Sequence, residues 1–145
     1  MPTMYRYQAT HSFHVRLKET TAVRSRYPDH VPIICEPAQG HESSQCDDAL
    51  FSSARRRVQR ELDRSKFLLP EKSTMTQLMI LLRRRLLLEE GQGVFVFVGG
   101  ELPPNSSCVG DLYRKWRDPD GFLYMSYGIE NTFGGVAGSC ERGYP

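Results

Sequence analysis

Residues 121–135, Gly-Phe-Leu-Tyr-Met-Ser-Tyr-Gly-Ile-Glu-Asn-Thr-Phe-Gly-Gly, combine a strand with a glycine-containing terminus. Side chains alternate in polarity from Phe122 to Tyr127, and Asp118-Pro-Asp-Gly121 before them is a strong turn signal. We therefore expect a last strand that forms a half-buried edge of a sheet. Gly134 has no β-carbon, so a narrow enzyme channel can close around the backbone there. This arrangement suits cleavage after a glycine and joining of the new carboxylate to another molecule; a frayed terminus is the alternative.

Three further strands are expected before this one. Gly93-Val-Phe-Val-Phe-Val98 is apolar on both faces, which predicts a central strand. Val31-Pro-Ile-Ile-Cys35 is a short apolar run between turn signals and predicts a buried strand. Lys66-Phe-Leu-Leu-Pro70 is its expected hairpin partner at the edge of the sheet. The connection between these two strands is unusually long for a hairpin and indicates an excursion or a functional loop rather than compact structure.

The helices are predicted from periodicity and capping signals. Residues 12–26 form a modest amphipathic helix in which Phe13, Leu17 and Val23 share one side, and Pro28 ends it. The main helix spans residues 76–88 after Ser73-Thr74. A short helix follows a cap at Ser106-Ser107 and extends to about residue 116.

This order predicts an α+β fold with the β-grasp layout. A four-stranded mixed sheet carries one main helix across it, with an N-terminal helix or helices on the other side. The chain of 145 residues is expected to form one domain over residues 1–134. An insertion occupies about residues 38–60 of the first hairpin, and residues 135–145 form a propeptide-like tail.

Composition excludes several classes of protein. The formal net charge of +2 is too small to imply nucleic-acid binding by itself. No signal peptide or membrane-spanning run is present, which favours a reducing cytosolic location. Neither catalysis nor a metal site is expected, because ligand spacing and a Cys-His signature are missing among His11, His14, His30, His41, Cys35, Cys46, Cys108 and Cys140.

Basic residues gather near the predicted edge strand. They include residues 55–57, Arg60, Arg64, Lys66 and residues 83–85. A solvated helix face is the usual outcome for such runs. Three consecutive arginines in one helix cannot all point the same way, so at least one of residues 83–85 is expected to lie over the sheet edge. The functional interpretation is a docking edge for acidic residues, at which an extended peptide adds as a strand. The alternative is that the first helix or the long connection covers this edge.

Several motifs, in order, resemble one known family. They are Tyr27-Pro-Asp-His-Val-Pro-Ile-Ile, Lys66-Phe-Leu-Leu-Pro, Phe95-Val-Phe-Val, Leu102-Pro-Pro, Asp120-Gly-Phe-Leu-Tyr-Met-Ser-Tyr and Glu130-Asn-Thr-Phe-Gly134. Together they resemble the autophagy ubiquitin-like modifiers of the GABARAP and microtubule-associated light-chain type. The resemblance covers about residues 7–134, apart from the connection near residues 40–57.

The resemblance implies a function for the terminus. A cysteine protease of autophagy would cut between Gly134 and Gly135, just after Phe133. Activating and conjugating enzymes would then pass the carboxylate of Gly134 to phosphatidylethanolamine, with no other cofactor and no catalytic activity of the chain itself. The lipid would hold a cytoplasmic protein on the autophagosome membrane.

The resemblance also implies a groove for cargo receptors that carry an aromatic-x-x-aliphatic motif flanked by acids. The aromatic pocket would be lined by Glu19, Val23, Pro32, Ile34, Lys66, Leu68 and Phe122. The aliphatic pocket would use Phe67, Leu69, Pro70, Leu78 and Leu81. The acids would meet His30, Arg64, Lys66 and Arg85. Two alternatives stay open: an unconjugated peptide-binding scaffold, and a microtubule-binding protein with tubulin as partner. Nucleic acid is not an expected partner.

Overall fold

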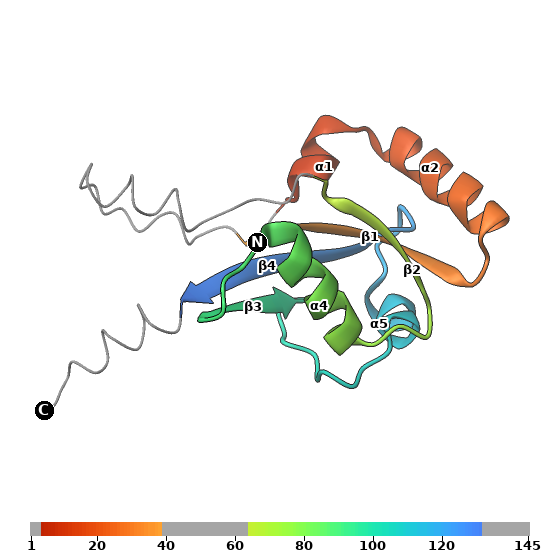
Figure 1. The fold of residues 1–145 in the computed structure, drawn as a ribbon. Helices are drawn as coiled ribbons and strands as arrows, with labels where there is room; N and C mark the ends of the chain where they lie inside the picture. Colours follow the sequence, from red (N-terminus) through yellow and green to blue (C-terminus); the bar gives the residue numbers. More distant parts are fainter. Residues whose placement is uncertain (1–3, 39–63, 132–145) are drawn as a thin grey trace, which may run out of the picture.

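A computed structural model describes residues 4–38 and 64–131 of the chain, and these form a four-stranded mixed sheet between two helical layers (Figure 1). The elements in chain order are α1 (Arg6–Thr10), α2 (Phe13–Arg26), β1 (His30–Pro37), β2 (Lys66–Pro70), α4 (Met75–Leu86), β3 (Gln92–Phe97), α5 (Val109–Trp116) and β4 (Leu123–Asn131). The strand order is β2-β1-β4-β3. Strands β1 and β4 are parallel, and the two outer pairs are antiparallel. The predicted α+β class and β-grasp layout are confirmed.

The order of strands corrects two predictions. β4 lies inside the sheet, between β1 and β3, and extends to Asn131 rather than ending near Tyr127 as an edge. β3, predicted as central, is an outer strand. Val94 and Val96 are buried, but Phe95 on the opposite face is 39% exposed. An apolar run on both faces therefore did not indicate a central position, because one of those faces is left partly open.

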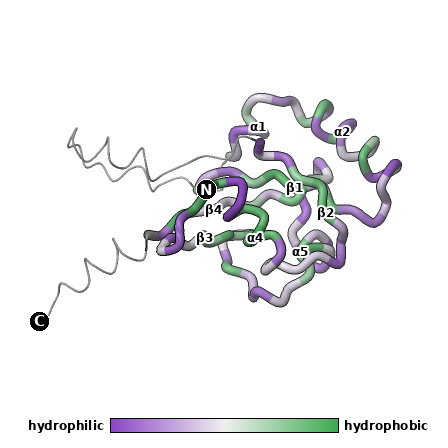
Figure 2. Tube along the Cα trace, viewed as in Figure 1, coloured by the Kyte–Doolittle hydropathy of each residue, from purple (hydrophilic) through white to green (hydrophobic). Residues whose placement is uncertain are grey.

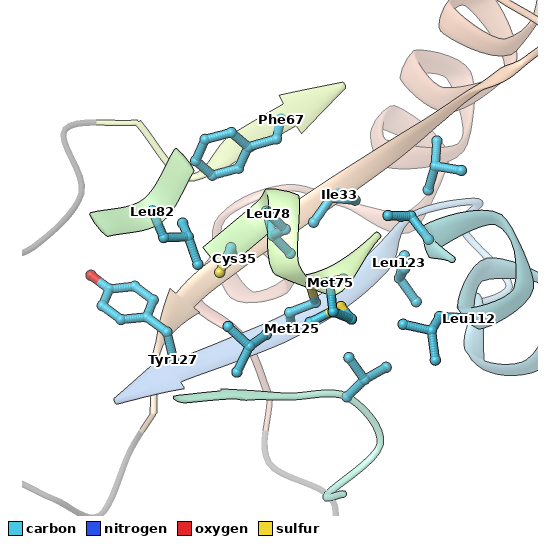
Figure 3. Close-up of a cluster of buried hydrophobic side chains, with 14 of the residues drawn as sticks. Ile33, Cys35, Phe67, Met75, Leu78, Leu82, Leu112, Leu123, Met125 and Tyr127 are labelled. Carbon is cyan, nitrogen blue, oxygen red and sulfur yellow. The ribbon is translucent and has the colours of Figure 1, made fainter. Parts of the chain in front are cut away.

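The main core lies between α4, α5 and one face of the sheet (Figure 3). Alternate strand residues point into it: Val31, Ile33 and Cys35 of β1, Phe67 of β2, Val94 and Val96 of β3, and Leu123, Met125 and Tyr127 of β4. From α4, Leu78 and Leu82 lie over the strands without any exposed surface. Figure 2 shows the hydrophobic residues concentrated in the strands and α4, while α2 alternates with hydrophilic positions.

Helix α2 begins and ends where predicted but presents a different side to the sheet. Ser12 caps it by accepting a hydrogen bond from the Val15 N–H, and the helix ends before Tyr27-Pro28. Phe13 and Leu17, expected on the buried side, are 46% and 37% exposed. The prediction of an apolar buried side was therefore wrong, because polar contacts rather than apolar periodicity orient this helix.

Those contacts centre on Asp120, which is completely buried in the turn before β4. Its Oδ2 accepts hydrogen bonds from Arg16 Nη1 at 2.5 Å and from the Tyr124 hydroxyl at 2.6 Å. Its Oδ1 accepts the N–H of Phe122 at 2.8 Å. On α2, Thr20 donates to the Asp120 carbonyl at 2.6 Å. A buried charge is tolerated only when it is paired and hydrogen-bonded, and all of these partners together meet that requirement.

A second buried carboxylate holds α1 in place. Glu36 of β1 accepts the backbone N–H groups of Arg6 and Tyr7 at 2.7 and 2.9 Å, which are among the first N–H groups of the helix and have no partner within it. The Tyr7 ring then packs edge-on against Phe122, with 5.4 Å between ring centroids. The Tyr7 side chain, Ile34, Phe122 and Tyr124 form a small second core on this face of the sheet.

The start of α4 agrees with prediction, whereas its end and the start of α5 do not: α4 was predicted to extend to Leu88 and ends at Leu86, because Leu87 takes the left-handed conformation. Thr74 caps α4, and Gln77 donates its N–H to Thr74 and accepts the Thr74 N–H in return, which is a capping box. For α5 the cap was predicted at Ser106-Ser107 but lies at Cys108, whose side chain makes no capping hydrogen bond. The backbone N–H of Val109 is instead satisfied by the Ser73 carbonyl at 2.8 Å, so packing against the α4 entrance sets the start of α5.

Candidate functional site

Strand β2 is one edge of the sheet, as predicted, and its outward backbone groups can be identified. Cys35 N–H donates to the Ser65 carbonyl at 2.9 Å. The register pairs Ile33 with Phe67 and Pro32 with Leu68. Since hydrogen-bonded pairs alternate along an antiparallel ladder, Phe67 bonds toward β1 and Leu68 and Lys66 direct their N–H and C=O groups outward. Among the described residues, no other strand pairs with this side of β2.

The residues predicted for the aromatic pocket lie on the face of the sheet that carries α1 and α2. Lys66 and Leu68 alternate onto this face of β2, and Pro32 and Ile34 lie beside them on β1. Leu68 is 37% exposed, whereas Ile34 and Phe122 are 0% and 2% exposed. Ile34 and Phe122 therefore lie beneath the surface of this predicted pocket. Leu68 and the half-buried Val23 are more accessible to a peptide than these two residues are.

The residues predicted for the aliphatic pocket lie on the opposite face, between β2 and α4. Phe67 and Leu78 belong to the main core, and Leu69 and Leu81 are partly buried against it. Pro70 is the exception: it is exposed at the end of the strand and alternates onto the same face as Lys66 and Leu68. The two predicted sets, apart from Pro70, are thus separated by the edge strand itself. Whether receptor residues occupy them stays a prediction.

A polar cluster lies over the Lys66 end of β2. Lys66 Nζ donates to Glu19 Oε2 at 2.6 Å and lies 5.3 Å from the centre of the Tyr7 ring. The Tyr7 hydroxyl donates to the other oxygen of Glu19. Burial alone would raise the pKa of Glu19, but the hydrogen bonds from Lys66 and Tyr7 outweigh it and lower that pKa. Burial and the bond to Glu19 raise the pKa of Tyr7. Tyr7 was not predicted here, since α1 is too short to give a periodic signal.

The residues predicted to meet acids surround the two ends of β2. Arg64 is exposed just before the strand. The Arg85 guanidinium lies 5.7 Å from the centre of the Phe67 ring, so one arginine of the run 83–85 does lie over the sheet edge. His30 is opposite Pro70 at the other end. Its Nδ1 lies 3.7 Å from the Asp29 carboxylate and makes no hydrogen bond with any described residue.

Residues 4–38 and 64–131 were predicted to hold neither a metal site nor a reactive cysteine at position 35. No group of three or more His, Cys, Asp or Glu side chains in this part could hold a metal ion. Cys35 is fully buried, and burial raises the pKa of its thiol, which disfavours the reactive thiolate. No described helix is long and apolar enough to span a bilayer; the longest, α2, has 14 residues.

The predicted conjugation residue lies outside the described residues. β4 ends at Asn131, which pairs with Gln92 at the start of β3. Phe133, Gly134 and Gly135 follow beyond that point, and the expected insertion falls largely in residues 39–63, also outside the description. The structure therefore gives the side of the sheet from which the terminus leaves, and not the conformation of the terminus.

The sheet order, the helix across one face and the N-terminal helical layer on the other define a ubiquitin-like protein. A family model described as "Autophagy protein Atg8 ubiquitin like" matches residues 49–134. The chain belongs to this Atg8 family of ubiquitin-like autophagy proteins, as the sequence motifs predicted.

Individual relatives support the same assignment over most of the chain. Autophagy-related protein 8b of Arabidopsis thaliana is 34% identical over 89% of this chain and 93% of its own length. Autophagy-related protein 8 of Pichia angusta is 32% identical over 90% of this chain and 92% of its own. The crystal structure of Trypanosoma brucei ATG8 superposes with a TM-score of 0.73 at 36% identity, covering 91% of this chain and all of that one.

Proposed function

We propose that this chain is a conjugated modifier of autophagy, and that the β2 edge binds receptor peptides. Peptide binding is supported by the edge of β2 left unpaired in the described part of the chain, which has apolar surface on both faces of the sheet. Lys66 and Leu68 offer outward backbone groups to an added strand, and Leu68 and Leu69 offer side chains to opposite faces.

The spacing of an aromatic-x-x-aliphatic motif fits this geometry. Successive side chains of an extended peptide point to opposite faces, so positions three apart lie on opposite sides and about 10 Å from each other. One anchor would enter between β2 and α2, and the other between β2 and α4. A motif with only one residue between its anchors would place both on the same face, where only one of the two surfaces is reachable.

Charge supports acidic residues beside the motif. Arg64 is exposed near one end of β2. Lys66 pairs with Glu19, and neither side chain of this pair is fully buried. The side chains of Lys66 and Glu19 are 45% and 29% exposed, so water screens the pair in part, and an acid of the peptide can reach Lys66 and exchange with Glu19. A role in binding these acidic residues accounts for the basic side chains without nucleic-acid binding.

Peptide titration followed by amide resonances of the labelled full chain tests the groove. An acid-flanked Trp-x-x-Leu peptide should shift Lys66 to Leu69, and the Trp-x-Leu peptide should bind about tenfold or more weakly, since burying one leucine is worth about 1.5–3 kcal/mol. Leu68→Asp should weaken binding similarly, with exposed Leu102→Asp as the matched control. Equal affinity of the two peptides, or shifts confined to α5, would contradict the proposal.

The modifier half of the proposal is that Gly134 is exposed by cleavage and joined to phosphatidylethanolamine, which places a cytoplasmic protein on the autophagosome membrane. In cells, the mature chain should have the mass of residues 1–134 and its conjugate. Gly134→Ala should abolish both, while Gly135→Ala on the other side of the bond should be processed. If the chain is not processed but still binds the peptide, the conjugation proposal is rejected and the alternative of an unconjugated scaffold is favoured. If the chain binds microtubules and Gly134→Ala does not change that binding, the light-chain-like alternative is favoured.

A further inference from the structure

Leu87, directly after α4, combines exposure with an unfavourable backbone conformation. Its side chain is 65% exposed, and its φ of 55° makes it the one non-glycine residue with positive φ in the described part of the chain. The left-handed conformation costs an L-residue about 1–2 kcal/mol, and glycine or asparagine is usual at this position of a helix end. The closing hydrogen bonds come from backbone groups, Leu87 N–H to the Arg84 carbonyl at 3.2 Å and Leu88 N–H to the Arg83 carbonyl at 3.1 Å. Folding therefore does not require a leucine side chain here.

The loop that carries Leu87 lies at the end of the sheet from which the C-terminus leaves (Figure 1). Arg83 donates to the carbonyls of Glu89 and Gln92, which ties the helix end to the start of β3. Gln92 in turn pairs with Asn131, the last residue of β4. Gly134 is three residues further along the chain, so a group attached to it can be no more than about 10 Å from the end of β4.

The described segments that adjoin this loop carry balanced formal charges. The last turn of α4 contributes Arg83, Arg84 and Arg85, and the following loop and β4 contribute Glu89, Glu90 and Glu130. A strongly basic surface would favour anionic lipid, and a strongly acidic one would be repelled by it. A neutral surface with one protruding leucine instead fits zwitterionic headgroups, with the leucine reaching the acyl boundary.

We propose that Leu87 is a membrane-contact residue that inserts into a zwitterionic bilayer when the C-terminus is attached to that bilayer. The inference depends on the proposed conjugation only for what brings the chain to the membrane. It adds a second, reversible contact to the tether, which orients the sheet end toward the lipid and leaves the β2 edge accessible at the side of the domain.

The experiment supplies the tether without the conjugation enzymes. Residues 135–140 of the full chain are replaced by histidine, and the protein is bound to phosphatidylcholine vesicles that contain a nickel-chelating lipid. Leu87→Trp and Leu102→Trp are compared with lipids brominated on their acyl chains. Leu102 is the matched control, because it is 56% exposed and follows the turn at the opposite end of β3. The parent protein, whose single tryptophan is Trp116, gives the background fluorescence that is subtracted.

We expect brominated lipid to quench the added fluorescence of Leu87→Trp and not that of Leu102→Trp. Leu87→Asn, which tolerates the left-handed conformation, should release from the vesicles with imidazole about tenfold faster, the factor that corresponds to losing most of one buried leucine. Equal quenching at the two positions, or unchanged release of Leu87→Asn, would overturn the inference. A blue shift of the Leu87→Trp fluorescence that occurs without vesicles and disappears on dilution would indicate self-association through Leu87. That result would also overturn the inference.

Failure of this inference and failure of the proposed function can be told apart. Conjugation at Gly134 in cells without quenching of Leu87→Trp on vesicles would reject the contact and keep the modifier. Quenching on vesicles together with an unprocessed chain in cells would keep the contact surface and reject the conjugation.

Discussion

The buried ion pair that joins α2 to the turn before β4 gives the sharpest test of the architecture. Asp120→Asn preserves the volume of the side chain, and Oδ1 can still accept the Phe122 N–H at 2.8 Å. The charge that accepts Arg16 Nη1 at 2.5 Å and the Tyr124 hydroxyl at 2.6 Å is lost. The Arg16 side chain is only 11% exposed and would be left without its counter-charge. Removing one partner of a buried pair costs about 3–5 kcal/mol.

A loss of this size is a large part of the stability of a single domain, about 5–15 kcal/mol. Urea unfolding followed by circular dichroism should give that difference in the free energy of unfolding. The melting temperature should fall by about 10 °C for a chain of this length. Since α2 forms one wall of the groove, affinity for the Trp-x-x-Leu peptide should fall as well.

Arg16→Met supplies the control for this reasoning. In the Arg16→Met background no buried cation remains, so Asp120→Asn should cost at least about 2 kcal/mol less than in the parent, which is the range of coupling energies for residues in one network. Additive effects of the two substitutions, or a cost of Asp120→Asn below about 1 kcal/mol, would refute the idea that this pair positions α2.

Three further predictions concern single positions. Glu19 should titrate by NMR below the usual value of about 4.3, since its pKa is lowered, and Lys66→Met should move it upward. Because the folded pKa lies below the unfolded one, the contribution of this pair is present above the unfolded pKa and is lost as the pH falls through the folded pKa; greater stability at low pH would contradict this. Leu87→Gly should raise the free energy of unfolding by up to about 1 kcal/mol, because relief of the left-handed strain exceeds the entropy that glycine adds to the unfolded chain; urea unfolding measures it, and a decrease would argue against strain at φ 55°. Gly121→Ala should destabilise by more than about 2 kcal/mol, because φ is 93° there and the new Cβ would lie 2.7 Å from Thr20 Cβ; an unfolding curve like that of the parent would contradict it.

Much of the fold follows from local patterns. The order of elements from α2 onward, the start of α4 after Thr74, the end of α2 before Pro28 and the edge position of β2 were predictable, because capping, turn chemistry and apolar runs are encoded within a few residues. Helix α1 was not, because five residues are too few to give a periodic signal. For the candidate groove, the sequence shows an apolar edge strand with basic neighbours, and the edge position is confirmed. The residues that the family motifs assign to the groove stay a prediction, and Ile34, Phe122 and Leu78 among them are buried.

The position of each strand within the sheet was not predictable in this way. The runs at β3 and β4 have similar apolar content, yet β4 lies inside the sheet and β3 at its edge. Periodicity reports which sides of a strand are apolar, and it does not report which strand lies beside it. Pairing of β4 with β1 joins segments about ninety positions apart, as in Ile33 with Leu123, and such contacts depend on the whole topology.

The sequence by itself determined that this chain is an α+β domain of the Atg8 family with β2 at an edge of the sheet; peptide binding at that edge and cleavage after Gly134 stay proposals. The tertiary structure decided which side of α2 is buried. Arg16 meets Asp120 across 104 positions of the chain, so a polar pair overrides the apolar side made by Phe13 and Leu17. It also decided that Leu87, in the loop from α4 to β3, is exposed. The orientation of α2 arises from a contact between distant segments, and local periodicity carries no record of it.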